Sequence, residues 1–509
     1  MSSQIYPGKT KIQRYYEGKT IFLTGGTGFL GKVLVEKILR CCPNVKQIFL
    51  LMREKRGMKA EERLKKLLQC EVFARQIQGN PEISRKLSVI PGDLSRPQLG
   101  LSPEHVAVIS QNVQIIFHSA ATLRFDERLS VAISTNVAAT KQLCLLAQNM
   151  LKLEAFVYVS TAYCNCDSPL VQEKVSGCRI SPENLMNLPN LLDENTLDEV
   201  TPVLLGSKPN SYIFTKCAAE VIIDKFKTSL PVAIFRPSIV LSSESEPFPG
   251  WIDNVSGPTG MAASLSAGLL HTTHFKYGAK VNLVPVDYTV NGIIALGYSV
   301  GSCKWVSPGE MPVVNFVSTA DNTITWGKFG DLLNHYMWQY PSAKLHWYPF
   351  TVRAGHHWSY VGLRTLFHYF PAALVDWATA RLGQPTKLTQ FYRRLDKYAA
   401  VVVYFSTREF KFEEGNADRL WNSLDSTDQE MFPFNMAAMD WNVYLRSYVL
   451  GCRRFLLKEG HNTIVASRRR IKMLYFLHLL TASAFFFLFY KFTVHFGRLF
   501  GKKPSLGPK

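Results

Sequence analysis

Three glycines close to the start of the chain lie where an apolar run meets a helical pattern, and this arrangement restricts the possible folds more than any other feature. Thr20–Thr24 has the composition of a buried parallel strand, and a helical pattern extends over Leu30–Leu39. Gly25, Gly28 and Gly31 mark the junction, a spacing that allows a tight turn and a close approach of the backbone to a pyrophosphate. The free N–H groups and the dipole at the helix N-terminus favour such an anion. The pattern therefore predicts a dinucleotide-binding strand–turn–helix unit.

The next apolar run, Gln47–Met52, ends at a basic residue. Arg53 follows it directly, and Glu54, Lys55 and Arg56 come after. A site for NAD usually carries an acid at this point to bind the ribose 2′-OH, whereas a basic residue accommodates a 2′-phosphate. Arg53 therefore predicts NADP(H), with a solvated basic loop as the alternative.

Short apolar runs alternate with helical patterns through the first part of the chain. Helices are expected over Val131–Leu151 and Ser211–Thr228. The expected strands are Thr20–Thr24, Gln47–Met52, Leu87–Pro91, Ile115–His118, Ala155–Ser160 and Val232–Arg236. Such alternation indicates an α/β fold with a doubly wound parallel sheet. Longer segments at 163–210 and 241–280 interrupt it, and insertions of this kind commonly build a substrate site.

Length and charge add further limits. The 509 residues exceed one compact core, so two or more domains are expected, the second being mainly helical and beginning near residue 350. Within it, Phe367–Trp377 is apolar but too short to span a bilayer, which leaves a core or an interfacial helix.

A net charge of +19 favours an anionic membrane face or a phosphorylated small molecule, and no nucleic-acid-binding motif accompanies it. Ten cysteines without metal-like spacing predict free thiols in a reducing compartment and no metal site.

A long apolar segment lies near the C-terminus. Met473–Tyr490 contains 18 residues without an acid, a lysine or an arginine. A transmembrane helix needs roughly 20 apolar residues, and the segment reaches that length over 473–494 if the Lys491 side chain snorkels. Basic residues from Arg468 to Lys472 precede it and would keep the main body cytosolic. Basic residues beyond it leave an in-plane or hairpin helix open, and a buried core helix is a further alternative.

Two polar clusters have the residue types needed for proton transfer. Tyr212 and Lys216 are spaced i, i+4 and so share one helical face. A lysine ammonium beside a phenol is expected to lower the tyrosine pKa, which suits Tyr212 to deliver a proton to an oxygen. Ser160 and Thr161 end the strand expected at Ala155–Ser160, where hydroxyls face the ligand crevice of a parallel sheet. Thr161 is the favoured donor to a substrate oxygen.

Taken in order, these motifs resemble the extended short-chain dehydrogenase/reductase pattern. The matching residues are Thr24–Gly31, Gly92–Leu94, His118–Ala121, Asn136, Val159–Thr161, Tyr212 and Lys216. A second set narrows the resemblance to the alcohol-forming fatty acyl-CoA reductases of insects and other animals. It comprises Leu50–Arg53, Val284–Tyr288, Phe410–Phe412, Asp440–Trp441 and Tyr448–Gly451.

The resemblance implies a role for each matching residue. The cofactor-binding residues would be Gly25, Thr27, Gly28, Phe29, Leu30, Gly31, Arg53, Asp93, Leu94, Ala120 and Lys216. Tyr212, Lys216, Thr161 and Ser160 would be catalytic, His118 structural, and the loop Pro247–Asn254 would line the acyl site. The implied domains are a reductase domain over 15–350, a helical domain over 351–465 and a membrane-anchoring helix over 473–494.

The implied activity is NADPH-dependent reduction of a long-chain fatty acyl-CoA to a primary alcohol for lipid and wax biosynthesis. Coenzyme A would leave after a hemithioacetal forms, and an aldehyde would follow. A membrane-bound steroid-type or other extended dehydrogenase remains an alternative, as does a catalytically silent NADP-binding scaffold. The C-terminal sequence Ser505–Lys509 is neither a peroxisomal nor an ER-retrieval signal. The endoplasmic reticulum, the peroxisome and the lipid-droplet surface are all open for an anchored protein, and the first is favoured. A homodimer is also left open.

Overall fold

The computed structural model describes residues 8–305 and 310–500, so the predictions that concern Ser505–Lys509 lie outside the described residues. Two compact units divide the chain. Unit 1 takes the described parts of Met1–Asn254, Lys276–Phe329 and Lys397–Gly451, and unit 2 takes those of Val255–Phe275, Gly330–Asp396 and Cys452–Lys509. The chain therefore enters unit 2 three times, and the units do not follow the expected single boundary near residue 350.

A seven-stranded sheet, parallel throughout, forms the centre of unit 1. Its strands are β1 (Thr20–Thr24), β2 (Gln47–Met52), β3 (Leu87–Pro91), β4 (Ile115–His118), β5 (Ala155–Val159), β6 (Val232–Pro237) and β11 (Val313–Phe316), in the order β11-β6-β5-β4-β1-β2-β3. The six expected strands are confirmed to within a residue, and β11 was not expected. The order reverses between β1 and β4, and in such sheets ligands bind beyond the carboxyl ends of the strands at this point.

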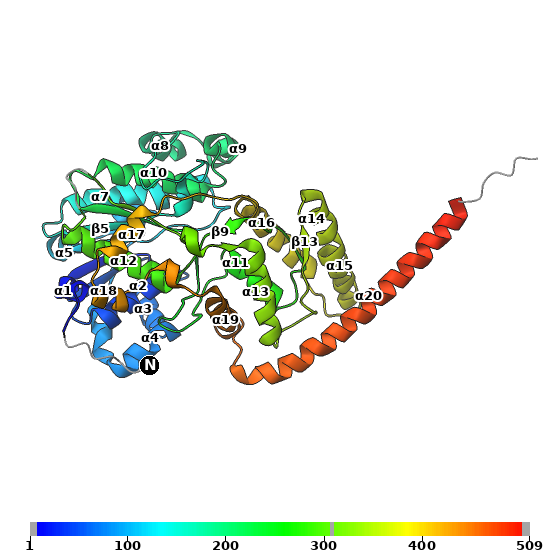
Figure 1. Cartoon of the computed structure of the whole chain (residues 1–509). Helices are drawn as coiled ribbons and strands as arrows, with labels where there is room; N and C mark the ends of the chain where they lie inside the picture. Colours follow the sequence, from blue (N-terminus) through cyan, green and yellow to red (C-terminus); the bar gives the residue numbers. More distant parts are fainter. Residues whose placement is uncertain (1–7, 306–309, 501–509) are drawn as a thin grey trace, which may run out of the picture. The chain divides into compact units, whose positions relative to one another are not determined.

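Helices cover both faces of this sheet (Figure 1), which confirms the doubly wound α/β fold. On one side, α2 (Phe29–Cys41) packs with α12 (Val286–Gly301), and on the other α7 (Ala139–Gln148) packs with α10 (Ser211–Lys225). The remaining helices of unit 1 are α1 (Lys11–Tyr16), α3 (Ala60–Leu68), α4 (Glu71–Gly79), α5 (Pro103–Asn112), α6 (Leu129–Ala132), α8 (Pro182–Leu191), α9 (Glu194–Leu205), α17 (Gly415–Asn422), α18 (Ser426–Met431) and α19 (Trp441–Gly451).

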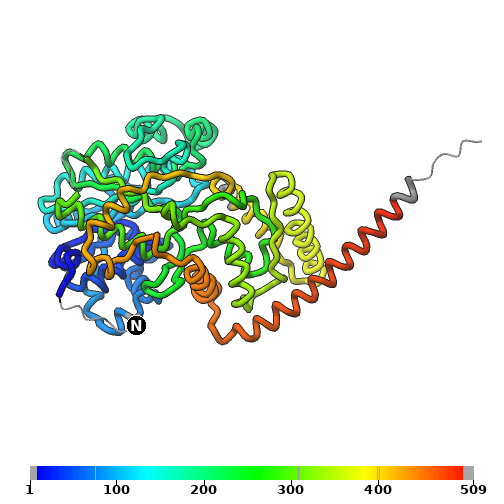
Figure 2. Tube along the Cα trace, viewed as in Figure 1, coloured from blue at the N-terminus to red at the C-terminus, as the bar shows by residue number. Residues whose placement is uncertain are grey.

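The late segment Lys397–Gly451 belongs to unit 1. Figure 2 shows it in yellow-orange to orange, running back through unit 1. Val171 pairs with Phe412 in a β-bridge, and the Val171 N–H donates to the carbonyl of Lys411 at 2.9 Å. The loop after β5 is thereby joined to a segment about 240 residues later in the chain.

Unit 2 is built mainly from helices and one small parallel sheet. Its helices are α11 (Pro258–Ser266), α14 (His357–Arg364), α15 (Phe370–Arg381) and α20 (Ile464–Phe500). A boundary between the units falls inside each of α13 (Trp326–Gln339) and α16 (Leu388–Ser406), so each of these helices has residues in both units. Strand β8 (Thr272–His274) pairs with β13 (Val352–Ala354). The short strand pairs β7 (Ile239–Leu241) with β10 (Leu283–Pro285) and β9 (Lys280–Val281) with β12 (Ile324–Thr325) belong to unit 1.

Among the described residues, two helical stretches are long and apolar enough to cross a membrane. Leu129–Gln148 is half buried because it covers the sheet of unit 1, as a core helix does. The stretch within His461–Phe496 is only 6% buried. Its exposure argues against the core-helix alternative and supports association of the chain with a membrane.

Candidate active site

The glycine-rich turn is shaped by two positions that cannot carry a side chain. Gly25 has φ +82°, and a Cβ there would lie 2.7 Å from the Ala120 amide nitrogen. A Cβ on Gly31 would lie 2.2 Å from the Gly25 carbonyl oxygen. The Gly28 N–H donates to that same oxygen at 2.9 Å and closes the turn. These close approaches bring the start of α2 up to the end of β1, as the sequence predicts.

No side chain caps the N-terminus of α2, whose N-cap is Gly28. Its first N–H groups, on Phe29 and Leu30, therefore have no side-chain acceptor at the cap, which suits a bound phosphate. Trp251 stacks on the Phe29 ring at 5.4 Å, and Asp253 pairs with Lys32 in the first turns of α2. The loop Pro247–Asn254 therefore lies against the glycine-rich turn and the first turns of α2. Its predicted role in lining the acyl site stays a prediction.

Two arginines lie beside this turn, although the sequence singled out only one. Arg53 follows β2 and is exposed, with Nη1 3.9 Å from Asp93 Oδ2. Arg63, on α3, donates from Nη1 to the Arg53 carbonyl at 2.5 Å and from Nη2 to Thr27 Oγ1 at 3.5 Å. Burial and the Arg53 charge lower the pKa of Arg63. Paired positive charge beside the turn suits a group with more negative charge than a ribose hydroxyl.

Asp93 lies beyond β3 at the edge of the same region. Its Oδ1 accepts the Ser95 N–H at 3.0 Å and the Ser95 hydroxyl at 2.8 Å. Burial opposes ionisation of Asp93, but the hydrogen bonds from Ser95 and the charge of Arg53 outweigh it and hold its pKa below the usual value. Leu94 packs against the core of unit 1. The segment is therefore fixed by its own contacts, and its predicted contact with the adenine stays a prediction.

His118 ends β4 and is fully buried. Its Nδ1 lies 2.7 Å from Thr24 Oγ1 and its Nε2 lies 3.0 Å from Thr140 Oγ1. Burial, followed by the Lys216 charge, lowers its pKa to about 3, so the ring is neutral. Ala120 donates its N–H to Thr24 Oγ1 at 3.3 Å. His118 therefore ties β4 to β1 and α7, in agreement with a structural role.

A π-helical turn lies between α6 and α7, over Ile133–Ala138. It contains Asn136, whose Oδ1 accepts the Thr122 N–H at 3.0 Å and whose Nδ2 donates to Thr215 Oγ1 at 2.9 Å. Single π-turns of this kind often occur at functional sites. Here the turn allows one side chain to hold the loop after β4 against α10, which carries Tyr212.

Lys216 is buried at the end of β5. Its Nζ donates to the Val159 carbonyl at 2.7 Å and lies 4.5 Å from the centre of the Tyr158 ring. Burial lowers the pKa of Lys216 to about 7, an effect that the nearby Glu220 carboxylate opposes. The i, i+4 spacing places Tyr212 one turn earlier on α10, whose N-cap Asn210 accepts the Ile213 N–H at 2.9 Å. One helix therefore presents both side chains, as the sequence predicts.

The expected effect of Lys216 on the pKa of Tyr212 is not seen in the structure. Burial, with a smaller effect of the Cys164 thiol, raises the pKa of Tyr212 instead of lowering it. Burial of the phenol is the dominant cause, and Lys216 directs its Nζ to the Val159 carbonyl. The expectation of a lowered pKa is wrong, and Tyr212 is a protonated phenol.

Ser160 and Thr161 directly follow β5. The Ser160 Oγ is buried and makes no hydrogen bond within the part of the chain that the structure describes. Thr161 is the N-cap of the 3-10 turn Ala162–Asn165, and its Oγ1 accepts the Tyr163 N–H at 3.2 Å. Its O–H can still donate to another acceptor, because the cap uses only a lone pair. Both hydroxyls stay candidates for contact with a substrate oxygen.

A buried ion pair next to Lys216 was not predicted from the sequence. Arg236, in β6, donates from Nε to Glu220 Oε1 at 2.8 Å and from Nη2 to Glu220 Oε2 at 2.6 Å. The side chains are 0% and 1% exposed. Arg236 also donates to the carbonyls of Gln172 and Lys174, so it holds the loop after β5. The i+4 spacing of Glu220 from Lys216 was the available signal.

A group of aromatic side chains next to Tyr212 was also missed. Phe125 meets the Tyr212 ring edge-to-face with centroids 5.8 Å apart, and Phe405 lies 6.3 Å beyond Phe125. Tyr163 contacts Phe405 at 5.2 Å and Phe410 at 5.3 Å. These rings, the aromatic cluster, come from three distant segments, so no local sequence pattern could reveal them. They give Tyr212 an apolar border within unit 1.

The residues present fit a dinucleotide. Side chains on Gly25 and Gly31 would collide with backbone, the start of α2 has no side-chain cap, and two arginines lie beside the turn. In the sheet order, this turn lies at the reversal between β1 and β4, and the carbonyl of Val159 on β5 holds Lys216. A turn that fits a dinucleotide and a tyrosine–lysine pair on α10 give the chain the features of an extended short-chain dehydrogenase/reductase.

Comparisons with known proteins agree with this class. Two solved reductase domains share the fold: the terminal reductase domain of the myxalamid pathway (TM-score 0.55, 17% identity, 90% of this chain and 94% of that one) and the reductase domain of a nonribosomal peptide synthetase from Mycobacterium tuberculosis (TM-score 0.57, 20% identity, 89% and 94%). A NAD-binding sequence family described as "Male sterility protein" matches residues 23–293, and a second family with the same description matches 367–459.

Relatives of similar length narrow the class. "Fatty acyl-CoA reductase wat" of Drosophila melanogaster is 38% identical over 94% of this chain and 92% of its own length. "Fatty acyl-CoA reductase 1" of Rattus norvegicus is 37% identical over 91% and 89%, and the Homo sapiens protein of that name is 36% identical over the same shares. The chain belongs to the fatty acyl-CoA reductase family and is an oxidoreductase. The second family match, over 367–459, covers most of the helical domain that the resemblance implied over 351–465.

Proposed function

We propose that this protein reduces a long-chain fatty acyl-CoA to a primary alcohol with NADPH and releases coenzyme A. The observation that supports it most strongly is the position of Tyr212, which lies on the same helix as Lys216 and against the aromatic ring of Phe125. A proton donor with an apolar border suits a carbonyl on an aliphatic chain. The full-length similarity to fatty acyl-CoA reductases supports the substrate class.

In this proposal, the glycine-rich turn and the N-terminus of α2 hold the pyrophosphate of the cofactor. Arg53 and Arg63 bind its 2′-phosphate, and Lys216 donates to the nicotinamide ribose. When bound, NADPH supplies the hydride, once for the thioester and once for the aldehyde. The rest of the chemistry is assigned to the side chains of the chain.

Tyr212 and Thr161 bind the carbonyl oxygen of the thioester. Their hydrogen bonds stabilise the negative charge that develops on this oxygen, an effect that is often the largest in such reactions. Tyr212 then gives its proton to the oxygen. As the hemithioacetal collapses, its hydroxyl proton returns to Tyr212, coenzyme A leaves as the thiolate and takes a proton from water, and the aldehyde remains. The aldehyde oxygen takes the same place in the second reduction, so one set of donors serves both steps. Because burial raises the pKa of Tyr212, the phenol is protonated at neutral pH before it donates.

The specificity for NADPH is assigned to the arginine pair. Hydrogen bonds to charged groups contribute about 1.5–3 kcal/mol, so removal of either guanidinium is expected to weaken NADPH binding by about ten- to a hundredfold. NADH binding should change little, because the 2′-phosphate is absent. Lys55→Ala, an exposed basic residue of the same loop, serves as the control for Arg53→Ala and Arg63→Ala.

Helix α20 is assigned as the membrane anchor of the protein, with the reductase unit on the cytosolic side. Its apolar stretch is exposed, and basic residues from Arg468 to Lys472 precede it. An apolar substrate that partitions into bilayers would then be available close to the enzyme. The endoplasmic reticulum stays the favoured location.

The decisive experiment measures NADPH oxidation and product mass in membranes that contain the protein, over a series of acyl-CoA chain lengths. Two NADPH consumed per coenzyme A released, with alcohol formed, is the expected result. Tyr212→Phe should lower the rate roughly 100- to 10,000-fold, the usual range for loss of a positioned proton donor, while NADPH still binds. An unchanged rate in Tyr212→Phe, or no turnover of any acyl-CoA by the wild type, would refute the proposal.

A further inference from the structure

In unit 2, a long helical segment carries an exposed row of large apolar side chains. Helices α14 and α15 are joined by a π-helical turn, Thr365–Tyr369, so the segment is helical from 357 to 381. Leu366, Phe370, Leu374 and Trp377 are spaced i, i+4, i+8 and i+11, which places them on one helical face. Their exposed fractions are 41%, 65%, 55% and 59%. We call this face the apolar row.

The opposite face of the same segment is packed and hydrogen-bonded. His368 stacks on Tyr392 of α16 at 4.7 Å and accepts the His271 N–H at 2.9 Å. Asp396 accepts hydrogen bonds from the Tyr369 hydroxyl at 2.6 Å and from Arg364 at 3.0 Å. Because these contacts fix the rotation of the helix, the apolar row cannot turn inward to avoid water.

The charged residues in this part of the chain are mostly basic. Between residues 357 and 396 the only acids are Asp376 and Asp396. The Asp376 carboxylate accepts the backbone N–H groups of Leu388 and Thr389, both at 2.9 Å, so it is occupied within the unit. The exposed basic residues of the same stretch are Arg381, Lys387, Arg393 and Arg394. An apolar row with aromatic side chains and basic neighbours is the composition of a helix that lies in a membrane interface.

The row is also linked to α20 within the same unit. Phe350 stacks on His478 of α20 at 4.7 Å and meets Phe367, beside the row, edge-to-face at 5.2 Å. Before His478, α20 packs through Ile471 and Leu474 against Leu345. After it, the apolar side chains of α20 are exposed. The part of α20 where packing ends and exposure begins is therefore linked through the Phe350 ring to Phe367, which neighbours the first residue of the apolar row.

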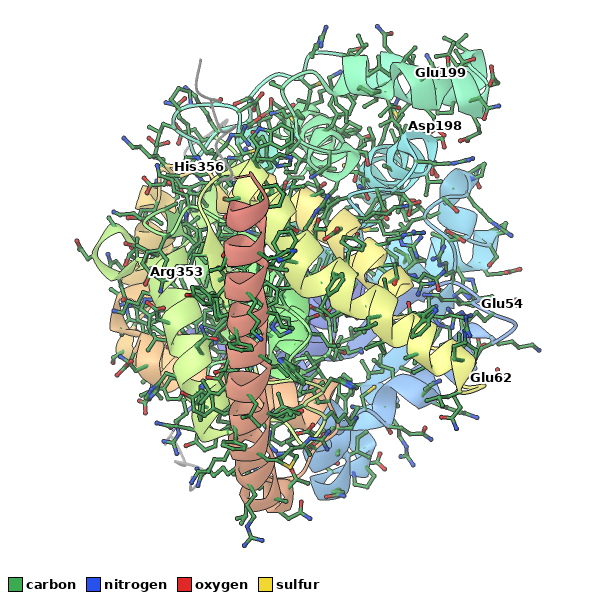
Figure 3. All side chains as sticks on the ribbon, turned by 90° about the vertical axis from the view of Figure 1, so that its right-hand side faces the viewer. Glu54, Glu62, Asp198, Glu199, Arg353 and His356 are labelled. Atoms are coloured by element: carbon green, nitrogen blue, oxygen red, sulfur yellow. The ribbon has the colours of Figure 1, made fainter. Side chains whose placement is uncertain are left out.

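Figure 3 shows the side chains of this face, with α20 as the salmon helix toward the viewer and the α14–α15 segment in yellow beside it, as in Figure 1. Arg353 and His356, which are labelled, lie at the surface on the segment that leads into α14. Both views place α15 and α20 near one another in unit 2.

We propose that the apolar row lies in the interface of the same membrane that α20 enters, with Phe370 and Trp377 in the headgroup and upper acyl region and with Arg381, which lies 5.4 Å from the centre of the Trp377 ring, at a lipid phosphate. The proposal rests on the assignment of α20 as the anchor. It gives the protein a second lipid contact, which fixes the rotation of unit 2 about the anchor, since a single helix can rotate freely in a bilayer.

The test places the photoreactive residue p-benzoylphenylalanine at single positions of the full-length chain. The protein is reconstituted in vesicles of phosphatidylcholine with a minor share of phosphatidylserine. Variants at Phe370 and Trp377 probe the row, Phe486 in α20 is the positive control, and Leu191 in α8, 74% exposed, is the matched control in unit 1. Phospholipid adducts are identified by mass after illumination.

Lipid adducts at positions 370, 377 and 486 but not at 191 are the expected result. If positions 370 and 377 behave like 191 while 486 reacts, the row lies in water and the proposal is overturned with the anchor intact. Adducts of twice the chain mass at 370 or 377 would overturn it in favour of a second copy of the chain. Absence of lipid at 486 would refute the anchor itself.

A second measurement does not depend on the unnatural residue. Trp377→Phe removes one tryptophan from the row. Trp338→Phe, which removes an exposed tryptophan of α13, is the comparison variant. In vesicles that contain brominated lipids, the quenchable share of the fluorescence should fall in Trp377→Phe. An equal quenchable share in the wild type and Trp377→Phe would contradict the proposed depth.

Discussion

The buried Glu220–Arg236 pair allows a direct test of how strongly the site depends on residues behind it. Glu220→Gln keeps the size of the side chain but leaves the Arg236 charge uncompensated, with both side chains almost fully buried. Loss of one partner of a buried pair costs about 3–5 kcal/mol. The amide nitrogen of the new side chain also faces guanidinium N–H groups that need an acceptor. The expected loss of unfolding free energy is therefore at the upper end of this range.

The matched control is Glu82→Gln, because Glu82 pairs with Arg85 at 2.5 Å while the side chains are 62% and 78% exposed. Such surface pairs contribute about 0–1 kcal/mol. Thermal unfolding of the two variants and the wild type is followed by tryptophan fluorescence in detergent, without cofactor. The midpoint of Glu220→Gln should fall several times further than that of Glu82→Gln. Equal shifts would show that the reasoning about the buried charge is incorrect.

Three further outcomes follow from the site. Gly31→Ala should abolish NADPH binding while the protein stays folded, because its Cβ meets the Gly25 carbonyl oxygen at 2.2 Å; titration calorimetry measures this. The pKa of Lys216 is about 7 in the folded chain and 10.5 ordinarily, so the folded state binds fewer protons between these values and stability should rise with pH across that window; Lys216→Met should remove the rise in denaturant titrations. Phe405→Ala should raise KM for long acyl-CoA several-fold and leave NADPH affinity unchanged, as steady-state kinetics would report.

Local patterns in the sequence predicted the parts of the site that depend on one segment. The glycine-rich turn, the strands and the Tyr212–Lys216 spacing follow from periodicity and from positions where only glycine fits. Arg53 was identified because it directly follows a strand. Each of these signals lies within a few residues, where chain connectivity alone decides the geometry.

Residues brought together from distant segments could not be predicted in this way. Arg63 reaches Thr27 from a helix ten residues after Arg53, and Phe405 reaches Phe125 from a segment assigned in advance to another domain. The raised pKa of Tyr212 is a consequence of burial, which the spacing to Lys216 does not report. Tertiary contacts decided these features.

The return of the chain into unit 1 affects the order in which the protein can be completed. Val171 pairs with Phe412, and Phe405 and Phe410 contact Tyr163, so part of the aromatic cluster beside Tyr212 is supplied late in the chain. During synthesis, the sheet and the glycine-rich turn can form while this part of the cluster is still missing. A ribosome-bound chain would therefore be able to bind a nucleotide before its apolar border beside Tyr212 is complete. The apolar side chains that are still exposed at that stage would be a target for chaperones.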